Sequence, residues 1–473
     1  MESNILLFCL FGISVALLSY ILPRQWRLGY LMVVNAAFYL LCSWEMFGVM
    51  LGVILITYFG SKEIEKSEGR RKRWMLAITI IPSLLLLFLT KYLGILSEFF
   101  ITMLSVIGVR DPSVNVVEAI TILGLSYYVF KAVSCAIDVY YKRMTTTWGG
   151  YFLELSTYIS FFSQIICGPI SRFNTFKEGL DDIGYHEKNA VQGIKKIVLG
   201  IFMKAVIADR LSIYVTNIYD NYESAPGLAL WMAAIFYAIQ LYCDFAGYSY
   251  VAIGLTDMLG LKCEMNFNKP YFSRSIKEFW NRWHISLSTW LRDYVYFPLG
   301  GSRCSKTRKF INIMLTFLVS GIWHGAGLTF IVWGLLHGLF VHLSPKSINK
   351  AASCRVKVIT TLLTFFIATF LWIFFRAGNM TIALTFIGRM FTDMQLNFTA
   401  IQQSILPFDN HNTCVSKFLV VSGFIFILGF KEWNDVYKKI NTKAWMSDVW
   451  FIFMICSIFL FGKFGVGFIY GNF

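Results

Sequence analysis

Long apolar runs constrain the fold of this chain more than any other feature of its sequence. Two of the clearest are Leu228 to Phe245 and Val358 to Phe374, and both approach the roughly 20 residues that carry a helix across the hydrocarbon core of a bilayer. No water is available there to bond backbone N–H and C=O groups, so helices and closed barrels are the structures that span it. These runs are continuous, whereas a lipid-facing barrel would show short alternating segments. The sequence therefore predicts an all-α polytopic membrane protein with roughly ten to thirteen membrane segments.

The composition agrees with residence in a membrane. Of the 473 residues, 57% are hydrophobic and 15% are charged, whereas a soluble domain carries about a quarter charged residues. The formal net charge of +15 is spread over many loops, which fits basic cytoplasmic loops and anionic lipid headgroups and makes nucleic acid a poor partner. The ten cysteines show no metal-ligand spacing, so we expect neither a metal site nor a disulfide framework.

The order of apolar and basic segments predicts a topology. Ile5 to Leu22 is the first span, and it has neither a basic region before it nor a small-residue cleavage site after it, so we expect it to be retained. Two spans fit within Leu28 to Phe59. The basic loop from Lys62 to Arg73 is expected in the cytoplasm, which places the N-terminus outside. Met75 to Leu89 and Tyr92 to Ile107 are the next two predicted spans.

The segment from Phe272 to Tyr294 has the period of a helix. Its apolar positions recur at spacings of three and four and include Trp280, Trp283 and Trp290, while the other face is mainly basic. A Trp-rich stripe opposite a basic face favours a helix that lies in the membrane interface. An ordinary amphipathic helix packed on a neighbour has the same period, so the sequence leaves both interpretations open.

His324 lies between two strongly apolar runs, Phe310 to Trp323 and Leu328 to Leu336. An ionisable side chain at membrane depth is costly, which makes this histidine a candidate for function. Glycines close by on both sides remove side-chain bulk, so that a substrate or another helix can approach closely. The alternative is a structural histidine bonded to a neighbouring helix.

Other polar residues near apolar runs also have two interpretations. Asp209 beside Arg210 could form a pair that faces a cavity, or an interfacial salt bridge, which is the commoner arrangement. Asp244 is either a hydrogen-bond partner inside the helix bundle or part of a reaction chamber. His337 follows His324 by thirteen residues, about 220° round a continuous helix, so we expect it to be structural unless the helix breaks at the glycines between them.

Three long motifs resemble the signature of the membrane-bound O-acyltransferases, in particular their alginate O-acetyltransferase branch. The motifs are Ser275 to Tyr294, Phe297 to Gly301 and Gly321 to Ala326, and their rare residues make the resemblance specific. They lie in a core region of residues 264–338. We expect one O-acyltransferase domain over residues 1–473, in which membrane helices and interfacial amphipathic helices surround a central funnel.

The residues that match the family motifs would carry the chemistry of acyl transfer. This reaction needs a base for the accepting hydroxyl, positioning of both substrates, and relief of charge on the oxyanion. His324 matches the family's catalytic histidine and is the candidate base, and His284 matches a second family histidine that is expected to shape or line the donor entry. The tail at residues 467–473 resembles an aromatic motif in which a tyrosine is proposed as acyl carrier, so Tyr470 is a candidate relay. Three arginines are candidates for contact with the anionic groups of coenzyme A, or else face lipid headgroups: Arg282, Arg292 and Arg303.

The resemblance implies a multi-pass acetyltransferase of the cytoplasmic (inner) membrane. It would take acetyl from cytoplasmic acetyl-CoA, a co-substrate and not a bound cofactor, and pass it through the funnel to an exported polysaccharide or cell-wall polymer. A separate extracytoplasmic esterase-like acetyltransferase is the implied partner. D-alanyl transfer to teichoic acid from a carrier protein is the alternative within the family, and the run from Trp290 to Gly301 favours the acetyl branch. A transporter or flippase for a saccharide precursor is the alternative from another class, but it would show repeated broken helices, and no repeat is visible.

Overall fold

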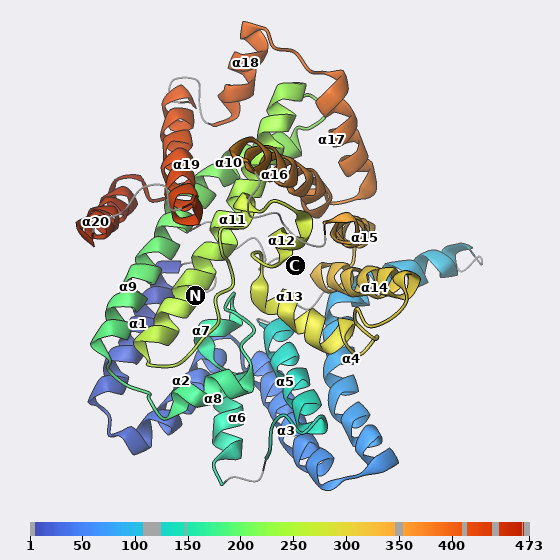
Figure 1. Cartoon of the computed structure of the whole chain (residues 1–473), viewed down its shortest axis with the longest axis vertical. Coiled ribbons are helices and arrows are strands. Elements are labelled where there is room, and N and C mark those ends of the chain that lie inside the picture. Colours follow the sequence, from blue (N-terminus) through green and yellow to red (C-terminus); the bar gives the residue numbers. More distant parts are fainter. Residues whose placement is uncertain are drawn as a thin grey trace.

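All regular structure is helical in the part of the chain that the computed structural model describes. The described residues are 5–106, 124–146, 149–345, 353–408, 414–437, 444–465 and 467. Figure 1 shows the N-terminal helices (blue to teal) at one end of the long axis, the C-terminal helices (orange to red) at the other, and the middle of the chain between them. The predicted all-α fold is confirmed.

Within the described ranges, five helices are long and apolar enough to cross a membrane: Trp44–Lys66, Gly69–Gly94, Gly227–Met258, Cys354–Arg376 and Cys414–Tyr437. Four shorter helices are also apolar: Ile5–Ile21, Leu328–Leu343, Met380–Thr392 and Trp445–Phe461. The polytopic class is therefore confirmed. These helices are fewer than the ten to thirteen segments predicted, partly because one helix, α4 (Gly69–Val106), runs through the predicted span Met75 to Leu89 and the described part of the next, which was predicted to begin at Tyr92. No glycine or proline separates the two runs, so the helix continues through them.

Helices α1 to α8 form the N-terminal end of the molecule (Figure 1). Here α3 packs against α4 and α5, and α2 packs against α6. Ser43 alone separates α2 from α3, and its hydroxyl caps α3 by accepting a hydrogen bond from the Met46 N–H at 3.3 Å. The remaining bounds are α1 (Ile5–Ile21), α2 (Arg24–Cys42), α3 (Trp44–Lys66), α5 (Leu125–Tyr140), α6 (Tyr151–Ile159), α7 (Phe162–Ile165) and α8 (Phe173–Leu180).

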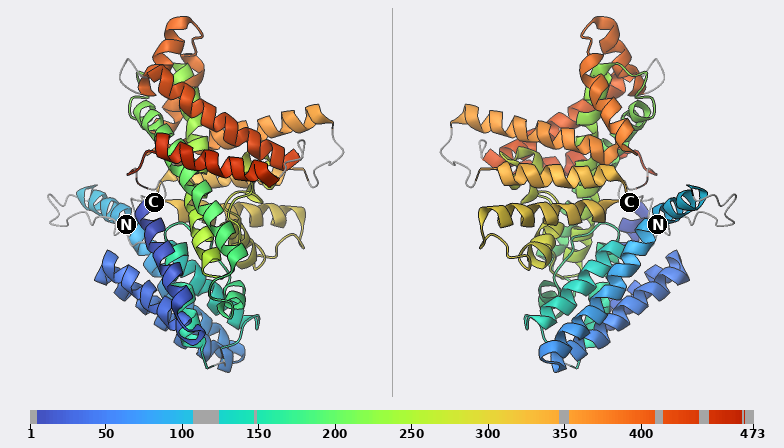
Figure 2. Two further views of the ribbon diagram at one scale, coloured as in Figure 1. Left: turned by 90° about the vertical axis from the view of Figure 1, so that its left-hand side faces the viewer. Right: turned by 90° about the vertical axis from the view of Figure 1, so that its right-hand side faces the viewer.

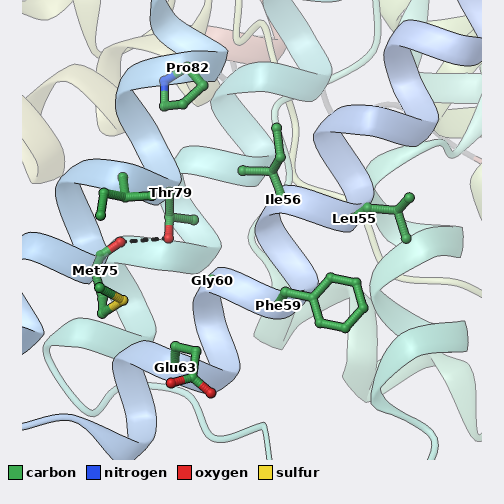
Figure 3. Close-up of a pocket in the computed structure, with 9 residues that line it drawn as sticks. Leu55, Ile56, Phe59, Gly60, Glu63, Met75, Thr79 and Pro82 are labelled. Atoms are coloured by element: carbon green, nitrogen blue, oxygen red, sulfur yellow. Dashed lines mark hydrogen bonds between the residues drawn. The ribbon is translucent and has the colours of Figure 1, made fainter.

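A groove of about 460 Å³ lies between α3 and α4. Figure 3 shows Leu55 and Phe59 on the α3 side of it, and Thr79 and Pro82 on the α4 side. The two helices touch at Gly60, where a Cβ would lie 2.1 Å from the Thr79 hydroxyl oxygen. None of the lining residues is a predicted site residue, so this groove is separate from the candidate site described below.

Two pairs of glycines bring α9 and α11 into close contact along the middle of the molecule. Gly193 faces Gly254 and Gly200 faces Gly247, and a Cβ on Gly193 would lie 2.6 Å from the Gly254 carbonyl oxygen. The glycines are seven residues apart in each helix and therefore share one face of it. Small residues at such a face let helix backbones approach closely in a membrane protein. The elements of this layer are α9 (Glu187–Ile201), the π-helical segment η1 (Phe202–Ala208), α10 (Asp209–Asp220) and α11 (Gly227–Met258).

The C-terminal part begins with a pair of adjacent helices, α14 and α15, which lie side by side in Figure 2. Close contact again depends on glycine, because a Cβ on Gly334 would lie 2.4 Å from the Phe317 carbonyl oxygen. The later helices form the upper end of Figure 1. The bounds are α14 (Lys306–His324), α15 (Leu328–Leu343), α16 (Cys354–Arg376), α17 (Met380–Thr392), α18 (Phe398–Ile405), η4 (Leu406–Phe408), α19 (Cys414–Tyr437) and α20 (Ala444–Phe461).

The segment from Phe272 to Tyr294 is not one helix, so the prediction of a continuous interfacial helix is wrong. The chain turns at His284, whose φ of 43° is left-handed. The helix is interrupted there because the Ile285 N–H donates to the Asn266 carbonyl oxygen and not to a carbonyl group of the preceding helical turn. The Trp-rich stripe is buried in the protein: Trp283 is 1% exposed and stacks on Phe279 with ring centroids 5.4 Å apart. Packing on neighbouring elements, the alternative interpretation, is what the structure shows. The elements are η2 (Pro270–Phe272), α12 (Ile276–Trp280), α13 (Ile285–Leu291) and η3 (Arg292–Tyr296).

Candidate active site

His324 is the last residue of α14, and Gly325 ends the helix in an extended conformation. The histidine is 3% exposed. Its ring lies against those of Trp323, Trp333 and Phe375, with centroids 4.6, 4.9 and 5.3 Å away. The imidazole is thus held in an aromatic enclosure to which α14, α15 and α16 contribute.

The glycines beside His324 serve the packing of α15 on α14. A Cβ on Gly321 would lie 2.4 Å from the Phe330 carbonyl oxygen, and one on Gly325 would lie 2.3 Å from the Phe330 ring. The sequence left open whether these glycines admit a substrate or another helix. At both positions the close neighbour is helix α15. It packs so tightly that neither glycine could be replaced by a residue with a larger side chain.

Two residues of α4 hold the end of α14 from the other side. The Tyr92 hydroxyl donates to the carbonyl oxygen of Ile322 at 2.7 Å and to that of Gly325 at 3.2 Å, and Lys91 Nζ donates to the Trp323 carbonyl oxygen. The last carbonyl groups of a helix have no partner within the helix, so these bonds satisfy them and fix the turn that carries the candidate base. The sequence analysis missed both residues. A lysine between two apolar runs was the signal that could have found Lys91.

His284 lies at the junction of α12 and α13 and is 1% exposed. Its Nδ1 is 3.0 Å from Asn266 Oδ1. The imidazole packs edge-on against Phe245, with ring centroids 4.6 Å apart, and its centroid is 6.1 Å from that of Trp323. Trp323 also contacts His324, and His284 is an electrostatic neighbour of that residue. The structure therefore brings together the two histidines that the sequence singled out, hereafter the histidine pair.

His337 lies closer to this pair than a continuous helix would allow. The helix breaks between α14 and α15, and Trp333 contacts both His324 and His337, with each imidazole centroid 4.9 Å from the tryptophan ring. Trp280 Nε1 donates to His337 Nδ1 at 3.2 Å, so Nδ1 is the acceptor nitrogen of this ring. The sequence predicted a structural His337 unless the helix broke at the glycines between it and His324, and the helix does break there. A structural role for His337 stays a prediction.

Lys204 on η1 forms a buried charge cluster with Asp209 and Asp244. Its Nζ lies 2.6 Å from a carboxylate oxygen of each, and all three side chains are at most 3% exposed. The predicted pair of Asp209 with Arg210 is wrong, since Arg210 Nε donates to the Phe461 carbonyl oxygen at 2.7 Å. The π-helical turn explains the difference, because i and i+5 share a face there and Lys204 precedes Asp209 by five residues. Asp244 is a bonding partner inside the bundle, which was one of its two interpretations.

A protein-family comparison decides what kind of site this is. The model of the membrane-bound O-acyltransferase family matches residues 148–385, which include both members of the histidine pair. The chain belongs to the membrane-bound O-acyltransferase family. It is therefore an acyltransferase and a multi-pass membrane protein.

Relatives of this O-acyltransferase extend over most of its length. A probable alginate O-acetylase AlgI of Pseudomonas syringae pv. tomato is 33% identical over 455 residues, which cover 94% of this chain and 85% of that protein. The peptidoglycan O-acetyltransferase of Helicobacter pylori is 31% identical and covers 76% of this chain and 72% of its own length. The teichoic acid D-alanyltransferase of Bacillus subtilis is 32% identical over 55% of this chain and 66% of that protein. The resemblance to the alginate branch of the family is confirmed.

The three arginines predicted to bind the donor of this O-acyltransferase are not equivalent. Arg282 donates to Glu278 at 2.7 Å, and Arg292 donates to Asp293 at 2.8 Å, so part of their charge is already balanced. Arg303 is exposed. Their contact with an anionic donor stays a prediction.

The C-terminal segment of the O-acyltransferase is fixed to η1 up to its last described residue. The Lys463 N–H donates to the Ala205 carbonyl oxygen at 2.9 Å, and Lys204 Nζ donates to the Gly467 carbonyl oxygen at 3.2 Å. Tyr470, the candidate relay, lies outside the described residues. The contact between the buried charge cluster and the tail could not be predicted from the sequence, because the two are more than 200 residues apart along the chain.

Proposed function

We propose that this protein transfers acetyl groups from cytoplasmic acetyl-CoA toward an extracytoplasmic polysaccharide or cell-wall polymer. The observation that carries the proposal is the histidine pair of His324 and His284, buried in an aromatic enclosure of a membrane acyltransferase. The names of its relatives, alginate O-acetylases and a peptidoglycan O-acetyltransferase, support an acetyl donor and a polysaccharide acceptor. The protein acts in the cytoplasmic (inner) membrane, and a separate extracytoplasmic acetyltransferase of esterase type completes the transfer.

The candidate base has the chemistry that a thioester reaction needs. His324 Nδ1 or Nε2 takes the proton of the accepting hydroxyl, whose oxygen forms a bond to the thioester carbonyl carbon. The C–S bond then breaks with its electron pair on sulfur, and the imidazolium returns the proton to the thiolate, so that free coenzyme A leaves. An apolar enclosure suits this role, because desolvation favours the neutral imidazole that can accept a proton.

The fixed tail supports a relay through Tyr470. Gly467, the last residue of the tail that the structure describes, is held by Lys204 Nζ, which donates to its carbonyl oxygen at 3.2 Å. Lys204 also binds Asp244. The next residue in the chain, Phe245, packs on His284 of the histidine pair. A phenol ester is more reactive than an alkyl ester, so a tyrosine can accept acetyl and pass it on. These contacts favour Tyr470 as the hydroxyl that receives the acetyl group first.

Consumption of labelled acetyl-CoA by the purified protein in lipid tests the proposal. Free-thiol release is expected from the wild type and is expected to fall by about 100-fold or more in His324→Ala, the size of a general-base contribution. His342→Ala is the matched control, because His342 is an exposed histidine on α15 and should keep its release. Near-normal release by folded His324→Ala would contradict the assignment of the base.

D-alanyl transfer is the second candidate, because teichoic acid D-alanyltransferases are about as identical to this chain over a shorter stretch. A carrier protein loaded with D-alanine as a thioester distinguishes the two. Acetyl-CoA is expected to be the better donor, and release of carrier thiol alone would favour the D-alanyl candidate. Membership of an acyltransferase family removes the ground for the transporter interpretation.

A further inference from the structure

Asn266 holds His284 in a network whose donors and acceptors can be assigned. Asn266 Oδ1 accepts from the Ser286 N–H at 3.4 Å and from Ser286 Oγ at 2.9 Å. A backbone N–H can only donate, so the oxygen and not the nitrogen of the amide must face this side. The amide nitrogen then donates to Ser249 Oγ at 3.0 Å, and Ser249 Oγ donates onward to the Cys167 carbonyl oxygen at 3.0 Å.

This assignment fixes the proton on the imidazole of His284. Its Nδ1 is 3.0 Å from an oxygen that can only accept, so Nδ1 must carry the hydrogen. In the neutral ring the other nitrogen, Nε2, is then an acceptor. Among the described residues Nε2 has no hydrogen-bond partner, although it is buried. An acceptor that is buried without a partner is costly in a protein interior.

The backbone adds a second and independent sign that this position is specialised. His284 has a φ of 43°, a conformation that residues other than glycine adopt rarely. The Ile285 N–H donates to the Asn266 carbonyl oxygen at 2.9 Å, so the same asparagine holds both the side chain and the backbone of this turn. Strain of this kind is typical of active sites, where it fixes a side chain in one orientation.

We propose that Asn266 is a positioning residue, which locks His284 in its Nδ1–H tautomer so that Nε2 accepts a hydrogen bond from an N–H or O–H group of a substrate. The inference rests on the proposed function, because it concerns the same histidine pair. Two substrate groups have the required chemistry: an amide N–H of the donor's pantetheine arm and a hydroxyl of the acceptor other than the one whose proton His324 takes. In either case His284 orients a substrate beside His324, which takes the proton.

The tautomer can be measured without any turnover. Solid-state NMR of protein labelled with ¹⁵N-histidine in lipid distinguishes a protonated Nδ1 from a protonated Nε2, and a His284→Gln sample identifies the signal. We expect His284 to carry its proton on Nδ1, and in Asn266→Leu we expect a mixture of both tautomers. A wild-type signal from the Nε2–H tautomer would overturn the proposal, whether or not the protein transfers acetyl groups.

Kinetics test the consequence for the reaction. Asn266→Leu is expected to lower kcat/KM by about tenfold, the effect of one lost hydrogen bond. Asn266→Asp keeps the acceptor but adds a charge that favours the doubly protonated ring, so its activity should fall near pH 7 and recover as pH rises. Among the described residues, the other charged or titratable neighbours of His324 are Lys91 and His337, and both are unchanged in these variants.

A matched control separates positioning from a loss of stability. Asn35 is also fully buried, its Oδ1 accepts from the Phe162 N–H at 3.1 Å, and its Nδ2 donates to the Thr157 carbonyl oxygen at 3.3 Å. Asn35→Asp should lower the unfolding temperature as Asn266→Asp does, but it should leave the shape of the pH profile unchanged. The same pH profile in Asn266→Asp as in the wild type would overturn the proposal.

Binding of an unreactive ketone analogue of acetyl-CoA identifies the substrate group. If the donor's amide is the partner, Asn266→Leu should bind the analogue about tenfold more weakly. If the acceptor's hydroxyl is the partner, binding should be unchanged while kcat falls. Unchanged binding together with unchanged kcat would overturn the proposal. If no form of the protein releases thiol, the wild type included, the result counts against the proposed function, and the NMR measurement alone decides the tautomer.

Discussion

At the scale of single residues, three charged side chains lie buried inside the helix bundle, away from water. The charge cluster of Lys204, Asp209 and Asp244 places one cation between two carboxylates inside the helix bundle. A buried ion survives when oppositely charged groups and hydrogen bonds replace its water. The same lysine also binds the Gly467 carbonyl oxygen, so the cluster serves both the bundle and the tail.

Lys204→Met is expected to lower the free energy of unfolding by about 3–5 kcal/mol, because it leaves two buried carboxylates without their cation. Lys195→Met is the matched control, since the pair of Lys195 with Asp448 is at the surface, 3.5 Å apart, and should contribute about 1 kcal/mol or less. Unfolding followed in detergent by denaturant or heat measures both variants. Equal losses in the two would show that the cluster does not stabilise the fold.

At the scale of elements, hydrophobic pattern predicted helices well and their breaks poorly. The continuous apolar runs gave the all-α class, and the period of Phe272 to Tyr294 identified its buried side. The break at His284 was not predictable, because it depends on backbone bonds to Asn266 and on a left-handed φ that no residue type at this position announces. Conversely, α4 runs through Lys91, although two separate spans were predicted on either side of this residue.

The contact between α9 and α11 gives a test at this scale. Gly193→Ala is expected to destabilise the protein by about 1–3 kcal/mol, because the new Cβ would lie 2.6 Å from the Gly254 carbonyl oxygen and the two helices would have to separate. Gly48→Ala, at an exposed position inside α3 with nothing within 4 Å of the new Cβ, should be neutral or stabilising by up to about 1 kcal/mol. Unfolding temperatures of the two variants check the difference, and equal values would argue against close glycine packing.

At the scale of the whole molecule, the candidate site is assembled from segments that are far apart in the sequence. His324 and His284 could be named from their motifs, but Lys91 of α4, Asn266 and the tail reach the site or its support only through tertiary contacts. Spacing along one chain carries no information about such contacts. The sequence therefore identified the candidate histidines of the site but not the groups that hold them.

The tail gives the prediction that depends on the whole assembly. Tyr470→Phe is expected to abolish acetylation of the polymer, because the phenol oxygen that would receive the acetyl group is gone, while the unfolding temperature stays unchanged. Tyr185→Phe is the control, since Tyr185 is 60% exposed and should keep full product formation. The measurement is transfer of labelled acetyl to polysaccharide by membranes that contain the partner protein. Full product formation by Tyr470→Phe would limit the tail to an anchoring role. Loss of product would support Tyr470 as the acyl carrier, since the substitution leaves the bond between Lys204 and the Gly467 carbonyl oxygen in place.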